Sequence, residues 1–155
     1  MKVTDRTRIN IHPERAVPEE AAEILSAGMV AHVGFVEDGQ PLVIPLSYYY
    51  DPSKPDLLYL HGGVKSRIMA NLANGAPVCV TVTLLDGLVY SRKAMNHSMN
   101  YRSVVLLGKA RAISGRQEKF DLFDQMVQRY YKDRTLETDY NPPRPRTWPQ
   151  PPWLR

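Results

Sequence analysis

Seven consecutive residues, His61-Gly62-Gly63-Val64-Lys65-Ser66-Arg67, display the clearest chemistry in this sequence. Glycine lets a backbone approach a bound group closely. The N–H groups at the start of a following helix, together with the helix dipole, favour an anion. Lys65 and Arg67 add positive charge, and arginine can donate two parallel hydrogen bonds to phosphate oxygens. The segment therefore predicts an anion site, with phosphate as the best-fitting ligand; the alternative is a solvated helix start capped by Ser66.

This turn must be held between a strand and a helix, and the surrounding pattern predicts both. Strands are predicted at residues 29–36, 41–50, 57–61, 78–83, 88–93 and 101–114, and helices at residues 18–28, 66–74 and 117–132. The Asp38-Gly39 and Asp86-Gly87 pairs predict tight hairpin turns, and residues 96–100 a polar break. Short strands in a small domain favour a barrel, because closure removes sheet edges. We expect an α+β protein that is mainly β, with an antiparallel six-stranded barrel and short helices.

Length and composition predict a single domain with a distinct tail. The chain has 155 residues and a net charge of +4, and residues 142–155 hold three arginines, no acid and six of the 13 prolines. We therefore assign residues 1–140 to the domain and expect residues 141–155 to be an extended or disordered tail. Because the basic charge belongs largely to the tail, nucleic acid is not an expected partner. No apolar run is long enough to span a membrane, and the polar N-terminus and single cysteine predict a cytoplasmic protein.

The remaining reactive side chains form no recognisable constellation. The other histidines, His12, His32 and His97, lack the spacing of a metal site, so no metal is expected. Cys79 alternates with valines along a strand and is interpreted as a small core residue. His61 and Tyr101 are weak candidates for a catalytic proton donor, because neither has a recognisable partner in sequence.

Four segments in this order resemble the pyridoxamine 5′-phosphate oxidase-like flavoproteins, which have an FMN-binding split barrel. They are the early HPERA, then GMVAHVGFVEDGQPLVIPLSYYYD, LYLHGGVKSRIMANLANGAPVCVTVTLLDGLV and HSMNYRSVVLLGKA. Together they cover roughly residues 12–132, and the sequence is most similar to the branch with nitroimidazole-resistance and flavin-nucleotide-binding proteins. After about Tyr140 the sequence departs from the family pattern, so the C-terminal strand could be missing.

The resemblance implies a homodimer with FMN at the subunit interface. In that pattern Val43, Ile44 and Pro45 run along the flavin, while His61 and Gly62 lie by the ring or the ribityl chain. Lys65, Ser66 and Arg67 would hold the phosphate. A second segment would line the site, from the same chain or its partner: Ser98, Asn100, Tyr101, Arg102 and Ser103.

The resemblance leaves several functions open. The leading hypothesis is an FMN-dependent oxidoreductase acting on a small molecule, either nitroreductase-like or pyridoxamine-phosphate-oxidase-like, in which the flavin carries the electrons. The alternatives are a flavin carrier or sensor without catalytic activity, and a haem-binding split-barrel protein. The sequence identifies neither the substrate nor the electron donor.

Overall fold

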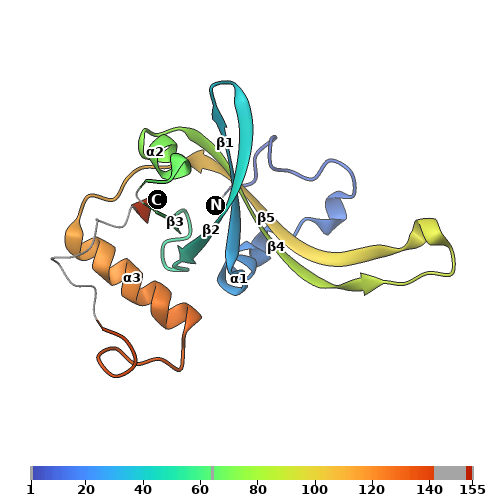
Figure 1. Cartoon of the computed structure of the whole chain (residues 1–155). Coiled ribbons are helices and arrows are strands. Elements are labelled where there is room, and N and C mark those ends of the chain that lie inside the picture. Colours follow the sequence, from blue (N-terminus) through green and yellow to red (C-terminus); the bar gives the residue numbers. More distant parts are fainter. Residues whose placement is uncertain (1, 64, 142–152, 155) are drawn as a thin grey trace.

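One antiparallel sheet forms the framework of the protein. The computed structural model describes residues 2–63 and 65–141, and the backbone of residues 153–154. The sheet has the order β5-β4-β1-β2-β3-β6 (Figure 1). Its strands are β1 (Val30–Glu37), β2 (Gln40–Tyr50), β3 (Leu58–His61), β4 (Pro77–Val89), β5 (Ser98–Lys109) and the two-residue β6 (Trp153–Leu154).

The β1–β2 hairpin forms where the Asp-Gly signal predicted it. Asp38 has φ 49° and Gly39 has φ 79°, so both turn residues adopt the left-handed conformation of a tight hairpin. The ladder runs from the Glu37–Gln40 pair to Val30–Ser47 without a shift in register. Alternation along the two strands then sends one set of side chains to the core and the other set to the opposite side of the sheet.

Three helices cover different parts of this sheet: α1 (Ala21–Ala27), α2 (Arg67–Ala73) and α3 (Arg116–Tyr130). The buried side chains of α1 and α2 join those of β1, β2, β4 and β5 in the main core. A second core cluster packs α3 against aromatic residues of β2 and β3, among them Tyr49 and Tyr59. Because Tyr49 alternates with the core residues Tyr48 and Tyr50, α3 covers the opposite face of the sheet, at its β3 end.

The β4–β5 hairpin is longer than expected and projects from the body (Figure 1). The prediction of a hairpin turn at Asp86-Gly87 was wrong, because β4 continues to Val89 and accommodates this site as a register irregularity between Leu85 and Gly87. The predicted polar break at residues 96–100 was also wrong in part, since β5 already begins at Ser98. The chain instead reverses at residues 90–97, which include the short helical turn Ala94–Asn96.

The α+β class and the antiparallel sheet are confirmed, but the sheet is open. Its edges are β5 and β6, and the described pairings do not join them. Most of the predicted tail lies outside the described residues; within it, β6 pairs with β3 through Leu154–Leu60 and Trp153–His61. Among the described helices, none is both long and apolar enough to cross a membrane.

Candidate functional site

The turn that follows β3 presents the polar groups predicted to bind an anion. Lys65 and Arg67 are exposed, and Ser66 is half-buried at the N-cap of α2. The Ser66 N–H donates to the Gly63 carbonyl at 2.9 Å. The Ser66 hydroxyl oxygen is buried and makes no hydrogen bond within the described part of the chain. Two cations and an unused hydroxyl group therefore lie on one short turn.

The two glycines of this turn have different surroundings. A Cβ atom at Gly62 would lie 3.0 Å from Met69 Sδ and 3.6 Å from Leu46 Cδ2, so this position has little room for a side chain. A Cβ atom at Gly63 would meet no atom of the described residues within 4 Å, its two chain neighbours aside. Gly62 therefore lets the chain pass closely between β2 and α2, while Gly63 faces open space.

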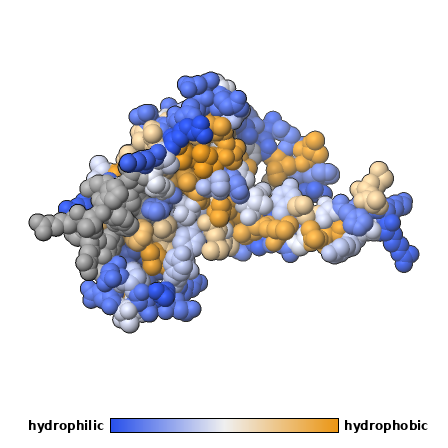
Figure 2. Space-filling model, in the orientation of Figure 1, coloured by the Kyte–Doolittle hydropathy of each residue, from blue (hydrophilic) through white to orange (hydrophobic). Residues whose placement is uncertain are grey.

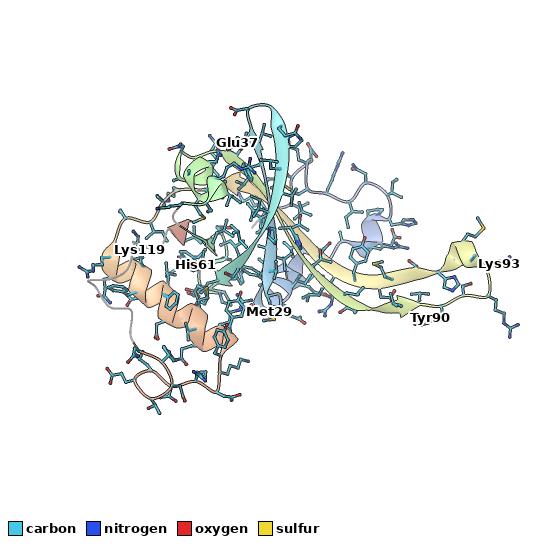
Figure 3. All side chains as sticks on the ribbon, in the orientation of Figure 1. Met29, Glu37, His61, Tyr90, Lys93 and Lys119 are labelled. Carbon is cyan, nitrogen blue, oxygen red and sulfur yellow. The ribbon has the colours of Figure 1, made fainter. Side chains whose placement is uncertain are left out.

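A carboxylate that the sequence did not single out contacts the predicted phosphate-binding arginine. Glu37, at the end of β1, places Oε2 3.2 Å from Arg67 Nη1. Its other carboxylate oxygen accepts a hydrogen bond from Asn71 Nδ2 at 2.5 Å. Figure 3 shows Glu37 beside α2. Arg67 and Asn71 are four residues apart and share one face of α2, but nothing in the sequence indicated that a hairpin acid would meet them.

Strand β2 has an unpaired edge close to this turn. It pairs with β1 over residues 40–47, whereas β3 reaches only residues 47–50. Residues 41–46 therefore have a described strand partner on one side only. In an antiparallel ladder the backbone groups of alternate residues point to opposite sides, so about half of those at 41–46 face away from β1. The predicted flavin-binding residues Val43, Ile44 and Pro45 lie in this stretch.

Side chains of the same stretch divide between the two faces of the sheet. Ile44 packs against the main core and can offer only its backbone to a ligand. Val43 and Pro45 are exposed on the opposite side, which we call the outer face. Neighbouring residues on the outer face follow from the strand registers: Gly34 and His32 of β1, Cys79 and Thr81 of β4, and Val105 and Leu107 of β5. Cys79 is exposed there, so the prediction that it faces the core was wrong.

The outer face is apolar over several strands. Val43 is 66 % exposed, and Val105 and Leu107 are 46 % and 47 % exposed. The projecting hairpin adds further exposed residues: Leu85, Leu88, Tyr90, Met95, Met99 and Tyr101. Figure 2 shows apolar surface at the centre of the molecule and along this hairpin. Contiguous exposed apolar surface of this kind is typical of an association or ligand-binding surface.

His61 lies where the outer face meets α3. It pairs with Ser47 of β2, and its ring centroid is 5.9 Å from that of Phe123 on α3. Burial lowers the pKa of the His61 imidazole below its ordinary value of 6.5. The ring is therefore held largely neutral near neutral pH, so it can donate one hydrogen bond and accept another.

The second predicted group of ligand residues lies on β5, at one edge of the sheet and three strands away from β2. Ser98, Asn100, Tyr101, Arg102 and Ser103 belong to β5, which is the edge opposite β3 and β6. Tyr101 is 59 % exposed. Arg102 donates to both carboxylate oxygens of Asp86, at 3.1 and 2.9 Å, and lies 3.4 Å from Glu23. These hydrogen bonds lower the pKa of the Asp86 carboxyl. Within one chain, the two predicted groups are thus not brought together.

The turn, the edge of β2 and the outer face together form the candidate site. The described part of the chain contains no group of three or more His, Cys, Asp or Glu residues placed to hold a metal ion. The site combines a cationic turn, an unpaired strand edge and an exposed apolar face. Together these can bind a flat, partly polar molecule that carries a phosphate group.

A comparison with known protein families identifies the family of this chain. The family model described as pyridoxamine 5′-phosphate oxidase matches residues 18–155. The chain belongs to this family. No curated protein matches the sequence.

Several solved structures of this family's fold are similar to the chain. The flavocytochrome Anf3 from Azotobacter vinelandii is 30 % identical with a TM-score of 0.79, covering 97 % of this chain and 69 % of that protein. An FAD- and haem-binding protein from Mycobacterium smegmatis is 29 % identical with a TM-score of 0.77, and the match covers 89 % of this chain but only 64 % of that protein. A putative 5-nitroimidazole antibiotic resistance protein from Bacteroides thetaiotaomicron is 25 % identical with a TM-score of 0.66, covering 89 % and 77 %.

Proposed function

We propose that this member of the pyridoxamine 5′-phosphate oxidase family binds FMN. The observation that carries the proposal is the cationic turn beside the unpaired edge of β2. The edge offers backbone donors and acceptors to a flavin ring, and the turn offers Lys65, Ser66 and Arg67 to a terminal phosphate. The FAD- and haem-binding protein from Mycobacterium smegmatis supports a flavin more generally, while the turn favours a ligand that ends in a phosphate.

The residues present fit such a ligand. The buried hydroxyl of Ser66 has no other described partner, and the open space at Gly63 leaves room beside it. Val43 and Pro45 would give the ring an apolar surface, while His61 could hold a proton at one ring nitrogen and accept at the other. When bound, a flavin supplies electron transfer to the site. The part of the protein is to bind and orient it and to shield it from water.

We further propose that two copies of the chain complete the site. The predicted ligand residues of β5 lie at one edge of the open sheet, whereas those of β2 and α2 lie toward the other edge. The outer face between the two groups carries exposed apolar residues. A second copy seated on the outer face would cover this surface and could bring its own Tyr101 or Ser103 to the flavin. The split barrel implied by the sequence would then be a property of the pair.

The proposed activity is that of an oxidoreductase acting on a small molecule. His61 and Tyr101, the two residues that the sequence suggested, are the candidate proton donors. A flavin carrier or sensor is the alternative. Turnover of NAD(P)H with a set of nitro and quinone acceptors would separate these two functions, because a carrier would bind flavin without sustained turnover.

A haem-binding function is a second candidate, because two of the most similar structures are a flavocytochrome and an FAD- and haem-binding protein. The lowered pKa of His61 keeps its imidazole neutral, which is the form that ligates iron. The absorbance spectrum of the purified protein distinguishes the two cofactors, since flavin and haem absorb at different wavelengths.

The decisive test of FMN binding is a comparison of FMN with riboflavin, which lacks the phosphate. Replacing Lys65 and Arg67 with alanine should weaken FMN by about 2–4 kcal/mol and leave riboflavin unchanged, because each charge-assisted hydrogen bond contributes about 1.5–3 kcal/mol and less where exposed. The double variant Arg92→Ala, Lys93→Ala removes the same charge from the segment that joins β4 to β5, where Figure 3 labels Lys93. This variant should bind FMN normally. Equal affinities for FMN and riboflavin in the unmodified protein would refute the proposal.

A further inference from the structure

Two side chains of α2 contact the carboxylate of Glu37. Its oxygens contact Arg67 Nη1 at 3.2 Å and Asn71 Nδ2 at 2.5 Å, and its side chain is only 23 % exposed. It also directly precedes the tight turn at Asp38 and Gly39, whose left-handed backbone fixes the end of β1. A carboxylate with these restraints has a defined position and cannot move freely away from α2.

This carboxylate uses the same donor that a ligand phosphate would use. An arginine guanidinium presents its N–H groups in a planar fork that matches a carboxylate or a phosphate equally well. Arg67 is 62 % exposed, so its remaining donors are accessible. With Glu37 beside them, the charges of Lys65 and Arg67 are partly offset. A phosphate that arrives at the turn meets an anion already in contact with the arginine.

We propose that Glu37 is an internal competitor that sets the affinity of the site for the ligand phosphate. This inference rests on the proposed FMN site and adds to it a residue that determines how tightly the phosphate is held. A phosphate carries two negative charges and the Glu37 carboxylate carries one, so the phosphate displaces the carboxylate from donors of Arg67. Breaking the contact between Glu37 and Arg67 costs free energy and so reduces the net free energy of phosphate binding. The flavin is then held less tightly than the two cations alone would allow.

Charge removal at Glu37 tests the proposal, and the neighbouring Asp38 supplies a matched control. E37Q and D38N each remove one negative charge from the same hairpin, but only E37Q removes a charge that lies against Arg67. Asparagine tolerates the left-handed backbone of residue 38, so D38N should fold normally. Affinities for FMN and riboflavin are measured for the unmodified protein and both variants at two salt concentrations.

E37Q should bind FMN about three- to tenfold more tightly than D38N, and the two should bind riboflavin equally. The advantage of E37Q should shrink at high salt. If E37Q does not fold, E37D retains the charge and withdraws it from Arg67, and should shift FMN affinity in the same direction. If E37Q binds FMN no more tightly than D38N does, the inference about Glu37 is overturned and the proposed function stands. If the unmodified protein does not bind FMN, the proposed function is overturned as well.

Discussion

Arg129 of α3 should make a larger contribution to stability than any other exposed or half-buried cation on that helix. Its Nη2 donates to three carbonyl groups at the C-terminal end of α1, those of Leu25, Ser26 and Gly28, at 2.9, 3.0 and 2.5 Å. Its Nη1 lies 3.4 Å from the Tyr48 carbonyl. A cation at this position donates to carbonyls at the end of a short helix, one of which, that of Leu25, also accepts from the Tyr48 hydroxyl at 2.7 Å, and it interacts favourably with the helix dipole.

Aromatic rings enclose the same guanidinium, which lies 4.9 Å from the centroid of Tyr48 and 5.2 Å from that of Tyr130. Hydrogen bonds from a charged donor contribute about 1.5–3 kcal/mol each where buried, but water can replace some of them at this half-buried site. We therefore expect Arg129→Met to lower the free energy of unfolding by about 2–4 kcal/mol. Arg129→Lys keeps the charge without the planar fork and should recover only part of this loss.

Urea denaturation followed by circular dichroism measures this loss, and Arg116→Met on the same helix is the matched control. Arg116 is exposed and lies 5.6 Å from the Phe120 ring centroid, a contact that contributes about 0.5–1 kcal/mol. Similar unfolding midpoints for Arg129→Met and Arg116→Met would refute the reasoning, because they would show that water replaces the carbonyl contacts at little cost. A selective loss would establish that α3 is anchored through the end of α1.

Two further predictions follow from the exposed and half-buried residues of the outer face. Because the folded protein lowers the pKa of His61, the unfolded chain binds more protons at this residue, so stability should fall as the pH decreases through about 6.5. Urea unfolding from pH 8 to pH 5 should show this component in the unmodified protein and not in His61→Asn; a stability difference between the two that is constant with pH would contradict it. Replacing Val105 and Leu107 with lysine should convert a dimer to a monomer in sedimentation experiments at micromolar concentration, whereas lysine at the exposed Tyr131 should not. A monomeric unmodified protein would contradict the dimer proposal.

Local signals in the sequence were sufficient for most elements near the site. The Asp38-Gly39 pair predicted the β1–β2 hairpin, and the structure places both residues at positive φ. The helix predicted over residues 66–74 is observed as Arg67–Ala73, with Ser66 at its N-cap. These predictions succeed because turn chemistry and helical periodicity act over a few residues, which a sequence shows directly; the Ser66 side chain itself makes no capping hydrogen bond in the described part of the chain.

The projecting hairpin shows where local signals were misleading. Asp86-Gly87 has the composition of a tight turn, but β5 pairs with β4 on both sides of it, and the ladder continues to Val89–Ser98. The polar residues at the start of β5 are exposed, so they do not oppose strand formation there. Alternation of apolar and polar residues predicts strands that have one face against a core. The same pattern is less informative for a two-stranded hairpin that projects into solvent.

Contacts between segments that are far apart in the sequence could not be predicted from the sequence. Spacing could not show that Glu37 contacts Arg67, since the two belong to a hairpin and a helix that are 30 positions apart. Spacing also could not show that β5 and β3 lie toward opposite edges of the sheet, an arrangement that separates the two predicted groups of ligand residues. Both features depend on strand order, and strand order is decided by the packing of the whole chain.

The unpaired edge of β2 connects the fold with the proposed chemistry. An edge with free N–H and C=O groups is a liability, and proteins usually pair it, cover it or protect it with charge. Here β3 stops pairing at Ser47, and the chain turns away through Gly62 toward α2 instead of extending the ladder. On our proposal, a flavin ring lies along residues 43–45 and takes the place of the missing strand, while its phosphate is held by the turn. The same short β3 that leaves the edge open also brings the turn toward it, since a Cβ atom at Gly62 would lie 3.6 Å from Leu46 Cδ2. On our proposal, this proximity lets ring-binding and phosphate-binding residues about 20 positions apart in the sequence serve one ligand.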